Sequence, residues 1–164
     1  MAAFTTVLAF DLGASTGRAI RAVYDGERLQ WKEIHRFDNI PAVENGHLRW
    51  NMEALLGEIR IAIQKAGKTD SLAFDTWGVD FVCVGKDGNL LRQPYAYRDP
   101  HTVGAPEALF SRISRSKVYG KTGIQIMNFN SLFQLDTLRR NHDSALEAAD
   151  KILFMPDALS YMLT

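Results

Sequence analysis

The sequence predicts an α/β domain whose sheet begins as an antiparallel β-meander, continues as a mixed sheet and is flanked by helices. Three β-rich apolar runs, at residues 7–12, 19–24 and 29–37, follow one another too closely to be joined by helical crossovers, so we expect them to pair in antiparallel fashion. A helical period then appears at residues 51–66, and a strand pattern returns at residues 71–76. This order differs from the βαβ start of a Rossmann fold.

Turn and cap residues mark the ends of the first elements. The first run ends at Gly13, and the second ends at Asp25-Gly26, a dipeptide typical of tight hairpins. The following helix is predicted from apolar residues at i, i+3, i+4, i+7 and i+11, which are Met52, Leu55, Leu56, Ile59 and Ile63. Asn51 suits its N-cap and Gly67 its C-cap.

The second half of the chain has looser patterns. A strand at residues 81–84 and a turn at residues 86–89 predict a further strand toward Tyr97. Beyond residue 100 we expect helices at residues 106–119, 131–142 (Leu132, Leu135 and Leu138 on one face) and 144–149, a strand at residues 152–155 and a helix at residues 156–163. Because the last apolar pattern runs to the end of the sequence, we expect the domain to be incomplete at its C-terminus.

The composition favours a globular protein that acts on small molecules. Its 164 residues suffice for one domain but not for two full ones. Lysines and arginines number 19, as do aspartates and glutamates, so no net charge attracts nucleic acid or an anionic membrane. No apolar run approaches the roughly 20 residues of a transmembrane helix. The lone Cys83 and an N-terminus without a secretory pattern agree with a reducing compartment, so we expect a cytoplasmic location.

Two predicted strands end in the same way. The letters AFD occur at residues 9–11 before LG, and again at residues 73–75 before TWG. An ionised carboxylate in a buried strand is unfavourable unless it is paired, hydrogen-bonded or bound to a metal. Asp11 and Asp75 therefore either cap the turns that follow them or have functional partners.

A loop of small residues follows the first of these carboxylates. It consists of Gly13, Ala14, Ser15, Thr16 and Gly17, and Arg18 comes next. Glycines are free to adopt positive φ, and successive N–H groups of such a turn can hold phosphate oxygens. Asp11, just beneath the loop, can hold a hydrated Mg²⁺, and Arg18 adds positive charge. The stretch matches neither G-x-x-x-x-G-K-[ST] nor G-x-G-x-x-G, so a plain hairpin turn is the alternative.

The letters WGVD at residues 77–80 form a candidate sugar site. The indole of Trp77 can cover the apolar face of a sugar ring, and Gly78 allows close approach of the backbone. The carboxylate of Asp80 can accept hydrogen bonds from hydroxyls. The alternative is a core tryptophan at a bend, followed by a surface aspartate.

Two other sets of polar residues are given structural interpretations. Arg98 and Asp99 are expected to pair with each other on the surface. Four histidines are scattered along the chain, at His35, His47, His101 and His142. None of them lies in a spacing typical of zinc ligands, so a zinc site is not expected.

Several segments together resemble a known family. The stretch AFDLGASTGR resembles the first phosphate motif of the superfamily of sugar kinases, heat-shock proteins and actin. Within it the sequence resembles the FGGY carbohydrate kinases, and most closely those that act on L-rhamnulose. The other segments that carry the resemblance are IHRFDN, DTWGVDF, AYRD, TGIQ, FNSLFQL and MPDALSYMLT. The resemblance implies a ribonuclease-H-like ATPase fold, with residues 1–164 as part of an N-terminal kinase domain.

The resemblance also implies a reaction, transfer of the γ-phosphoryl group of ATP to the 1-hydroxyl of L-rhamnulose. Residues 13–18 would hold the ATP phosphates, and Asp11 would face the Mg²⁺. Gly78 would lie against the ketose, with Trp77 and Asp80 as neighbours. In this family the base that accepts the hydroxyl proton lies further along the first domain. No residue of this chain is therefore assigned as catalytic base, and the chain alone is expected to be inactive.

Two alternatives remain open from the sequence. One is an FGGY kinase for another ketose or polyol, such as fuculose or xylulose. The other is a non-catalytic binding module of the ATPase superfamily. The expected partners are a ketose, ATP and the remainder of the kinase chain, without nucleic acid or membrane.

Overall fold

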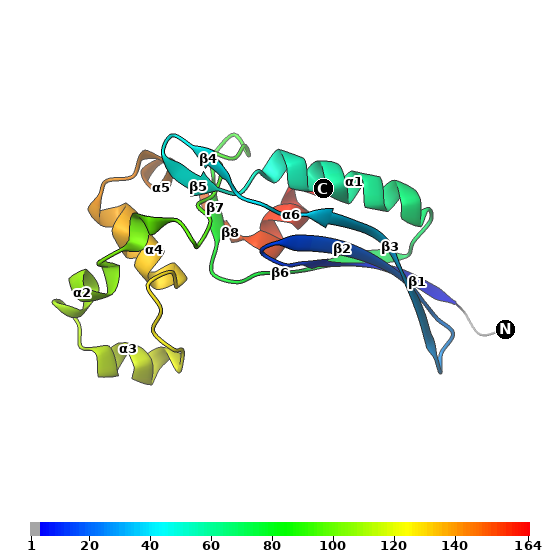
Figure 1. Ribbon diagram of the computed structural model, residues 1–164, viewed down its shortest axis with the longest axis horizontal. Helices are drawn as coiled ribbons and strands as arrows, with labels where there is room; N and C mark the ends of the chain where they lie inside the picture. Colours follow the sequence, from blue (N-terminus) through cyan, green and yellow to red (C-terminus); the bar gives the residue numbers. More distant parts are fainter. Residues whose placement is uncertain (1–3) are drawn as a thin grey trace. The chain divides into compact units, whose positions relative to one another are not determined.

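The computed structural model describes residues 4–164, which Figure 1 shows as a ribbon. The chain folds into two compact units. Unit 1 comprises Met1–Pro41, Asn51–Gly78 and Phe154–Thr164, and unit 2 comprises Ala42–Trp50 and Val79–Leu153. Unit 2 is therefore built from two segments that are inserted into the chain of unit 1.

A four-stranded mixed sheet forms the centre of unit 1. Its strands are β1 (Thr5–Leu12), β2 (Thr16–Tyr24), β3 (Leu29–Asp38) and β6 (Ser71–Thr76), in the order β3-β2-β1-β6. β2 pairs antiparallel with β1 and with β3, whereas β6 pairs parallel with β1. Gly26 takes a φ of 102° in the turn between β2 and β3. The predicted β-meander and mixed sheet are confirmed.

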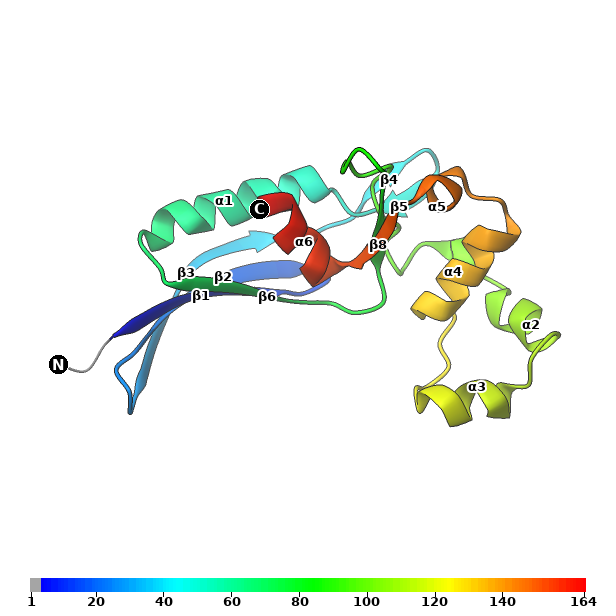
Figure 2. The same ribbon diagram turned by 180° about the vertical axis from the view of Figure 1, so that it is seen from behind.

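Two helices of unit 1 cover one face of this sheet, as both ribbon views show (Figures 1 and 2). α1 (Met52–Ala66) packs on β2 and β3, and α6 (Met155–Leu163) packs on β6. The predicted caps of α1 form: Asn51 Oδ1 accepts a hydrogen bond from the N–H of Ala54 at 3.0 Å, and Gly67 ends the helix with φ 66°. The buried side chains of α1 are Met52, Leu55, Leu56, Ile59, Ala62 and Ala66.

Unit 2 has short strands and helices around smaller apolar clusters. Its strands are β4 (Ala42–Glu44), β5 (His47–Arg49), β7 (Phe81–Val84) and β8 (Lys151–Phe154), of which β4 pairs with β5 and β7 with β8. Its helices are η1 (Pro100–Thr102), α2 (Ala105–Phe110), α3 (Arg115–Thr122), α4 (Ser131–Arg140) and α5 (Ser144–Ala148). One cluster joins β7 to α4 and α5, and another joins α2 to α4.

The structure corrects several expectations for unit 2. The helix predicted at residues 106–119 is broken into α2 and α3, because Ser114 caps a new helix by accepting from the N–H of Lys117. The strand expected toward Tyr97 is reduced to isolated bridges at Leu90 and Tyr95. Leu132, predicted on the apolar face of α4, is 41% exposed. The short β4–β5 hairpin was not predicted.

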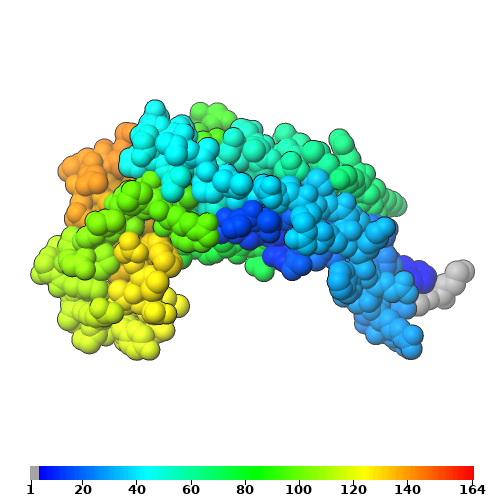
Figure 3. Space-filling view, viewed as in Figure 1, coloured from blue at the N-terminus to red at the C-terminus, as the bar shows by residue number. Residues whose placement is uncertain are grey.

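The β2–β3 turn stands at the surface of unit 1, where it is coloured mid-blue in the space-filling view of Figure 3. Near it, Leu29 and Trp31 on β3 are 59% and 67% exposed. Over the part of the chain that the structure describes, every helix is too short or too polar to cross a bilayer.

Candidate functional site

The predicted phosphate loop and the Trp77-Gly78 motif meet in unit 1. β1 and β6 run parallel, so their carboxyl ends lie at the same edge of the sheet. The backbone N–H of Trp77 donates to the carbonyl of Leu12 at 3.0 Å, directly before the loop that begins at Gly13. Two motifs that are more than 60 residues apart in the sequence are thereby brought side by side.

The two AFD segments, at residues 9–11 and 73–75, pair with each other in register on β1 and β6. Asp11 is the register partner of Asp75, and Phe10 is the partner of Phe74. The two phenyl rings stack with centroids 4.9 Å apart. Because side chains alternate along a strand, Asp11 points away from the face that buries Phe10. The two carboxylates therefore project from the same side of the sheet edge.

Asp11 forms an ion pair with Arg18. The two residues are register partners across β1 and β2, and Arg18 Nε–H donates to Asp11 Oδ2 at 2.7 Å. Both side chains are 45% exposed. On β3, Arg36 is the register partner of Arg18 and forms a bidentate ion pair with Glu33 at 2.9 and 2.6 Å. Two guanidinium groups thus lie on neighbouring strands beside the loop, and the second was not predicted.

Asn39 donates two hydrogen bonds to carbonyls of the loop, a role that was not predicted from the sequence. The Asn39 side chain is buried, and its Nδ2–H donates to the carbonyl of Gly13 at 2.8 Å. The backbone N–H of Asn39 donates to the carbonyl of Ser15 at 2.9 Å. A third bond, from the N–H of Gly13 to the carbonyl of Thr16 at 2.9 Å, closes the hairpin. Asn39 thereby holds two carbonyls of the loop, those of Gly13 and Ser15.

The two loop glycines do not have the positive φ that the sequence analysis expected of them. Positive φ was expected to explain them, but among the described residues neither Gly13 nor Gly17 has it. Gly17 is instead covered by the ring of Phe37, and a Cβ on it would lie 2.6 Å from Phe37 Cε2. Close packing, not backbone freedom, therefore requires glycine at this position.

Replacing Gly17 by alanine is expected to lower the free energy of unfolding by about 1–3 kcal/mol, since the buried Phe37 ring must move aside. Thermal unfolding of the purified protein measures this. The matched control is Gly57→Ala in α1, where a Cβ meets nothing within 4 Å and alanine is expected to be neutral or stabilising. Equal melting temperatures for Gly17→Ala and the unaltered protein would contradict the packing argument.

The carboxylates of Asp11 and Asp75 suit a hydrated magnesium ion that also binds phosphates. The residues described contain no group of three or more histidine, cysteine or acidic side chains arranged for a metal. Mg²⁺ bound with a nucleotide takes one or two carboxylates, phosphate oxygens and several waters. Asp11, exposed at the sheet edge with Asp75 beside it, can supply such carboxylates. The exposed carboxylates at this edge of the sheet therefore fit this ion.

Asp80 lies inside unit 2 and not on its surface. It is 1% exposed, and its Oδ2 accepts from Trp50 Nε1–H at 2.6 Å and from the N–H of Tyr97 at 3.1 Å. Its Oδ1 accepts from Gln134 Nε2–H at 3.0 Å. The surface position that the alternative gave to Asp80 is wrong. The buried carboxylate therefore accepts from two side chains and one backbone N–H of unit 2 and is not an exposed acceptor.

Gly78 is the exposed member of the motif. A Cβ placed on it would meet nothing within 4 Å.

Within unit 2, the ring of Tyr97 lies 5.4 Å from that of Phe129, and the guanidinium of Arg98 lies 5.3 Å from the Tyr97 ring centroid. Tyr97 lies in AYRD and Phe129 in FNSLFQL, but neither aromatic residue was assigned a role from the sequence.

Asp99 is not paired with Arg98 on the surface, which corrects the prediction. Its carboxylate is buried and accepts hydrogen bonds from the N–H of Leu48 at 2.6 Å and of His101 at 2.9 Å. Burial acts to raise the pKa of Asp99, but these bonds and His47 together lower it. Burial lowers the pKa of His101, and the Asp99 carboxylate offsets only part of this. Two of the scattered histidines are thus gathered around one carboxylate.

Comparison with known sequences identifies close relatives. Residues 6–164 match the N-terminal domain of the FGGY family of carbohydrate kinases. The chain is 66% identical over 160 residues to a rhamnulokinase of Bacteroides thetaiotaomicron and 42% identical over 161 residues to one of Lactiplantibacillus plantarum. These alignments cover 95% and 96% of the chain, but 33% and 32% of the two relatives. The chain thus spans about a third of the length of the curated relatives it matches.

Comparison with solved structures supports the predicted fold. A xylulose kinase from Rhodospirillum rubrum superposes with a TM-score of 0.78 at 12% identity, covering 96% of this chain and 34% of that one. A gluconate kinase from Lactobacillus acidophilus gives 0.75 at 15% identity, covering 92% and 31%. At these identities the likeness shows the fold alone, and it confirms the ribonuclease-H-like ATPase fold. Since the family match extends over nearly the whole sequence, this chain belongs to the FGGY family of carbohydrate kinases.

Proposed function

We propose that this chain forms the N-terminal part of an ATP-dependent kinase that phosphorylates L-rhamnulose at its 1-hydroxyl, giving L-rhamnulose 1-phosphate. The observation that carries this proposal is the hydrogen bond from Trp77 N–H to the Leu12 carbonyl. It places the loop proposed to hold the phosphoryl donor beside the motif proposed to hold the acceptor. The 66% identity to a rhamnulokinase supports the choice of sugar. A kinase that consumes ATP is expected to act in the cytoplasm.

The donor side of the proposed site is built from the first hairpin. Residues 13–18 surround the ATP phosphates, which accept from the Arg18 guanidinium and from backbone N–H groups of the loop. The N–H of Gly13 is not one of these, because it donates to the carbonyl of Thr16. Asp11 faces the Mg²⁺, which supplies neutralisation of the phosphate charge when bound. Arg18 is shared between Asp11 and the phosphates, so its present ion pair holds both side chains close to where the donor binds. Asn39 keeps the loop in shape before ATP arrives.

The acceptor side is built from the end of β6 and the residues after it. Gly78 lies against the ketose because no side chain separates its backbone from the solvent. Trp77 contributes a partly buried indole beside it. Asp80 is buried in unit 2, where it accepts from Trp50 and Tyr97, and it is not proposed to touch the sugar. The base that accepts the hydroxyl proton belongs to the part of the kinase that this chain does not span.

The decisive experiment expresses the complete open reading frame that contains this chain and measures ADP release with ATP, Mg²⁺ and a panel of ketoses. We expect the highest kcat/KM with L-rhamnulose, and no turnover by residues 1–164 alone. Higher activity on fuculose, xylulose or a polyol would replace the proposed substrate. If ATP binds but no sugar of the panel stimulates ADP release, a binding module is the better description.

Replacing Gly78 by alanine tests the proposed sugar-binding side of the site separately from the ATP-binding side. A methyl group at this position fills open space, so the melting temperature is expected to stay within about 1 °C of the unaltered kinase. The same methyl group lies where the sugar is proposed to approach, and we expect the KM for L-rhamnulose to rise about tenfold with the KM for ATP unchanged. Gly120→Ala, also in open space, is the control. An unchanged sugar KM would remove Gly78 from the site.

A further inference from the structure

Val79, the residue that follows Gly78, has an unusual backbone conformation. Its φ is 71°, in the left-handed region that β-branched side chains rarely adopt. Such a conformation is unfavourable by itself and persists only where surrounding contacts hold it, and it is common at functional sites. The angle φ of Val79 sets the direction of the Gly78–Val79 peptide relative to the rest of the turn. Whatever holds Val79 therefore also orients the backbone of Gly78.

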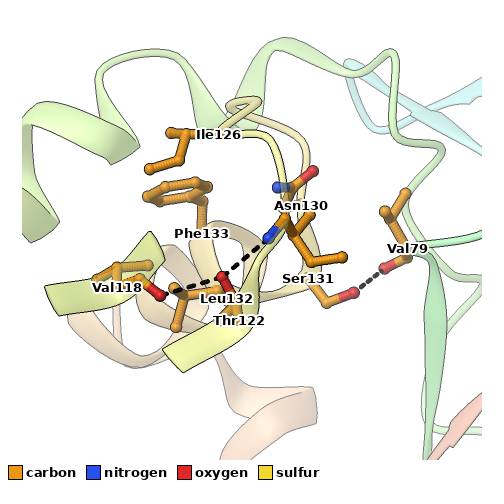
Figure 4. Close-up of a pocket in the computed structure, with 9 residues that line it drawn as sticks. Val79, Val118, Thr122, Ile126, Asn130, Ser131, Leu132 and Phe133 are labelled. Carbon is orange, nitrogen blue, oxygen red and sulfur yellow. Dashed lines mark hydrogen bonds between the residues drawn. The ribbon is translucent and has the colours of Figure 1, made fainter. Parts of the chain in front are cut away.

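The contacts that hold Val79 come from the first turn of α4. Figure 4 shows Ser131 directed at the Val79 carbonyl, to which its Oγ–H donates at 2.8 Å. Gln134 Nε2–H approaches the same carbonyl at 3.3 Å. In the figure Val79 also lies at the edge of a pocket of about 300 Å³, to which α4 contributes Ser131, Leu132 and Phe133. The strained residue is thus fixed by two side chains more than 50 residues away in the sequence.

Gln134 makes further bonds that connect this turn to its surroundings. It is 2% exposed, and its amide also donates to Asp80 Oδ1 at 3.0 Å and to the carbonyl of Phe129 at 2.9 Å. A side-chain amide has two N–H groups, so three acceptors share them and the longer bond to Val79 is the weakest. Asp80 in turn accepts from the N–H of Tyr97, whose ring lies against Phe129. One buried amide therefore links the turn, the carboxylate and the Phe129 loop.

We propose that Gln134 is a positioning residue of the kinase, which holds Val79 in its left-handed conformation and thereby fixes the backbone wall at Gly78 against which the ketose binds. This inference rests on the proposed function for its kinetic consequence. Its structural part, the hold on Val79, stands on the bonds of Gln134 and Ser131 alone. Gln134 touches neither the sugar nor ATP, so its replacement is expected to affect sugar binding more than binding of the phosphoryl donor.

The kinetic test replaces Gln134 by methionine, which has a similar length and cannot donate, in the complete kinase. We expect the KM for L-rhamnulose to rise about tenfold or more, while the KM for ATP stays within a factor of two. The control is Leu138→Ala on the same helix, which opens space in the cluster of Phe81, Cys83 and Ala145. This control is expected to lower the melting temperature by several degrees with an unchanged sugar KM. Equal effects of both variants on the sugar KM would overturn the positioning role.

A second test measures the hold on Val79 without any activity. Val79→Gly removes the conformational conflict, because glycine adopts positive φ readily. If Gln134 holds a strained residue, Gln134→Met lowers the melting temperature by fewer degrees in the Val79→Gly background than in the unaltered protein. An equal decrease of the melting temperature in both backgrounds would show that Gln134 does not stabilise the left-handed conformation of Val79. That result would overturn the proposal. This cycle gives its answer even if L-rhamnulose is not the substrate, so failure of the proposed function is distinguished from failure of this inference.

Discussion

Replacing Asp11 by asparagine is expected to lower kcat of the complete kinase about 100-fold or more, with little change in stability. The carboxylate faces the proposed position of Mg²⁺, and a neutral amide would hold the hydrated ion and its phosphates poorly. Stabilisation of transition-state charge by a metal contributes several kcal/mol, and each 1.4 kcal/mol corresponds to about a factor of ten in rate. The ion pair to Arg18 is half-exposed, and such pairs add little to folding.

Steady-state kinetics at a series of Mg²⁺ concentrations measures this effect, and thermal unfolding measures stability. Asp75→Asn provides a close comparison, since Asp75 is the register partner of Asp11 on β6 and exposed. We expect a smaller loss for Asp75→Asn, and a shift of the Mg²⁺ dependence to higher concentration for Asp11→Asn. A kcat for Asp11→Asn within threefold of the unaltered enzyme would remove Asp11 from the metal site.

Replacing Asp80 by alanine is expected to have the largest effect on stability, a loss of about 3–5 kcal/mol in the free energy of unfolding. Its buried carboxylate accepts hydrogen bonds from Trp50, Tyr97 and Gln134, and all three donors would be left without this acceptor. Asp80→Asn keeps the shape and one acceptor oxygen, but its amide meets a donor. We therefore expect an intermediate loss of roughly 1–3 kcal/mol for asparagine.

Urea unfolding of the three proteins gives the order of stability directly. Asp150→Ala is the control, since this exposed carboxylate pairs with the neighbouring Lys151 and its loss is expected to change little. A stability of Asp80→Ala equal to that of the unaltered protein would contradict the buried network. It would then favour an Asp80 side chain that is available to the sugar, as the sequence first suggested.

Elements with strong local patterns were predicted well. The β-meander follows from short apolar runs separated by turn residues, and α1 follows from its apolar period and from Asn51 and Gly67 at its ends. Residues 106–119 were mispredicted as one helix because the apolar period is weak there. The break depends on the cap at Ser114, which a propensity argument does not resolve.

The site was predicted in part, and the missing members share one property. Asn39 and Gln134 lie in IHRFDN and FNSLFQL, two segments that carry the family resemblance, but neither was assigned a role. Each acts through a bond to a residue far away in the sequence. A lone asparagine or glutamine carries no periodic signal. Their roles became visible only once the strands and α4 were placed.

The sequence by itself determined the β-meander, α1, the small-residue loop after Asp11 and the family resemblance, since these depend on neighbouring residues. The tertiary structure alone decided which side chains surround each polar group. It paired Asp11 with Asp75 across parallel strands, packed Phe37 on Gly17, and enclosed Asp80 between Trp50 and Gln134. The physical reason is that burial and hydrogen bonding of a side chain depend on residues that only folding brings within reach.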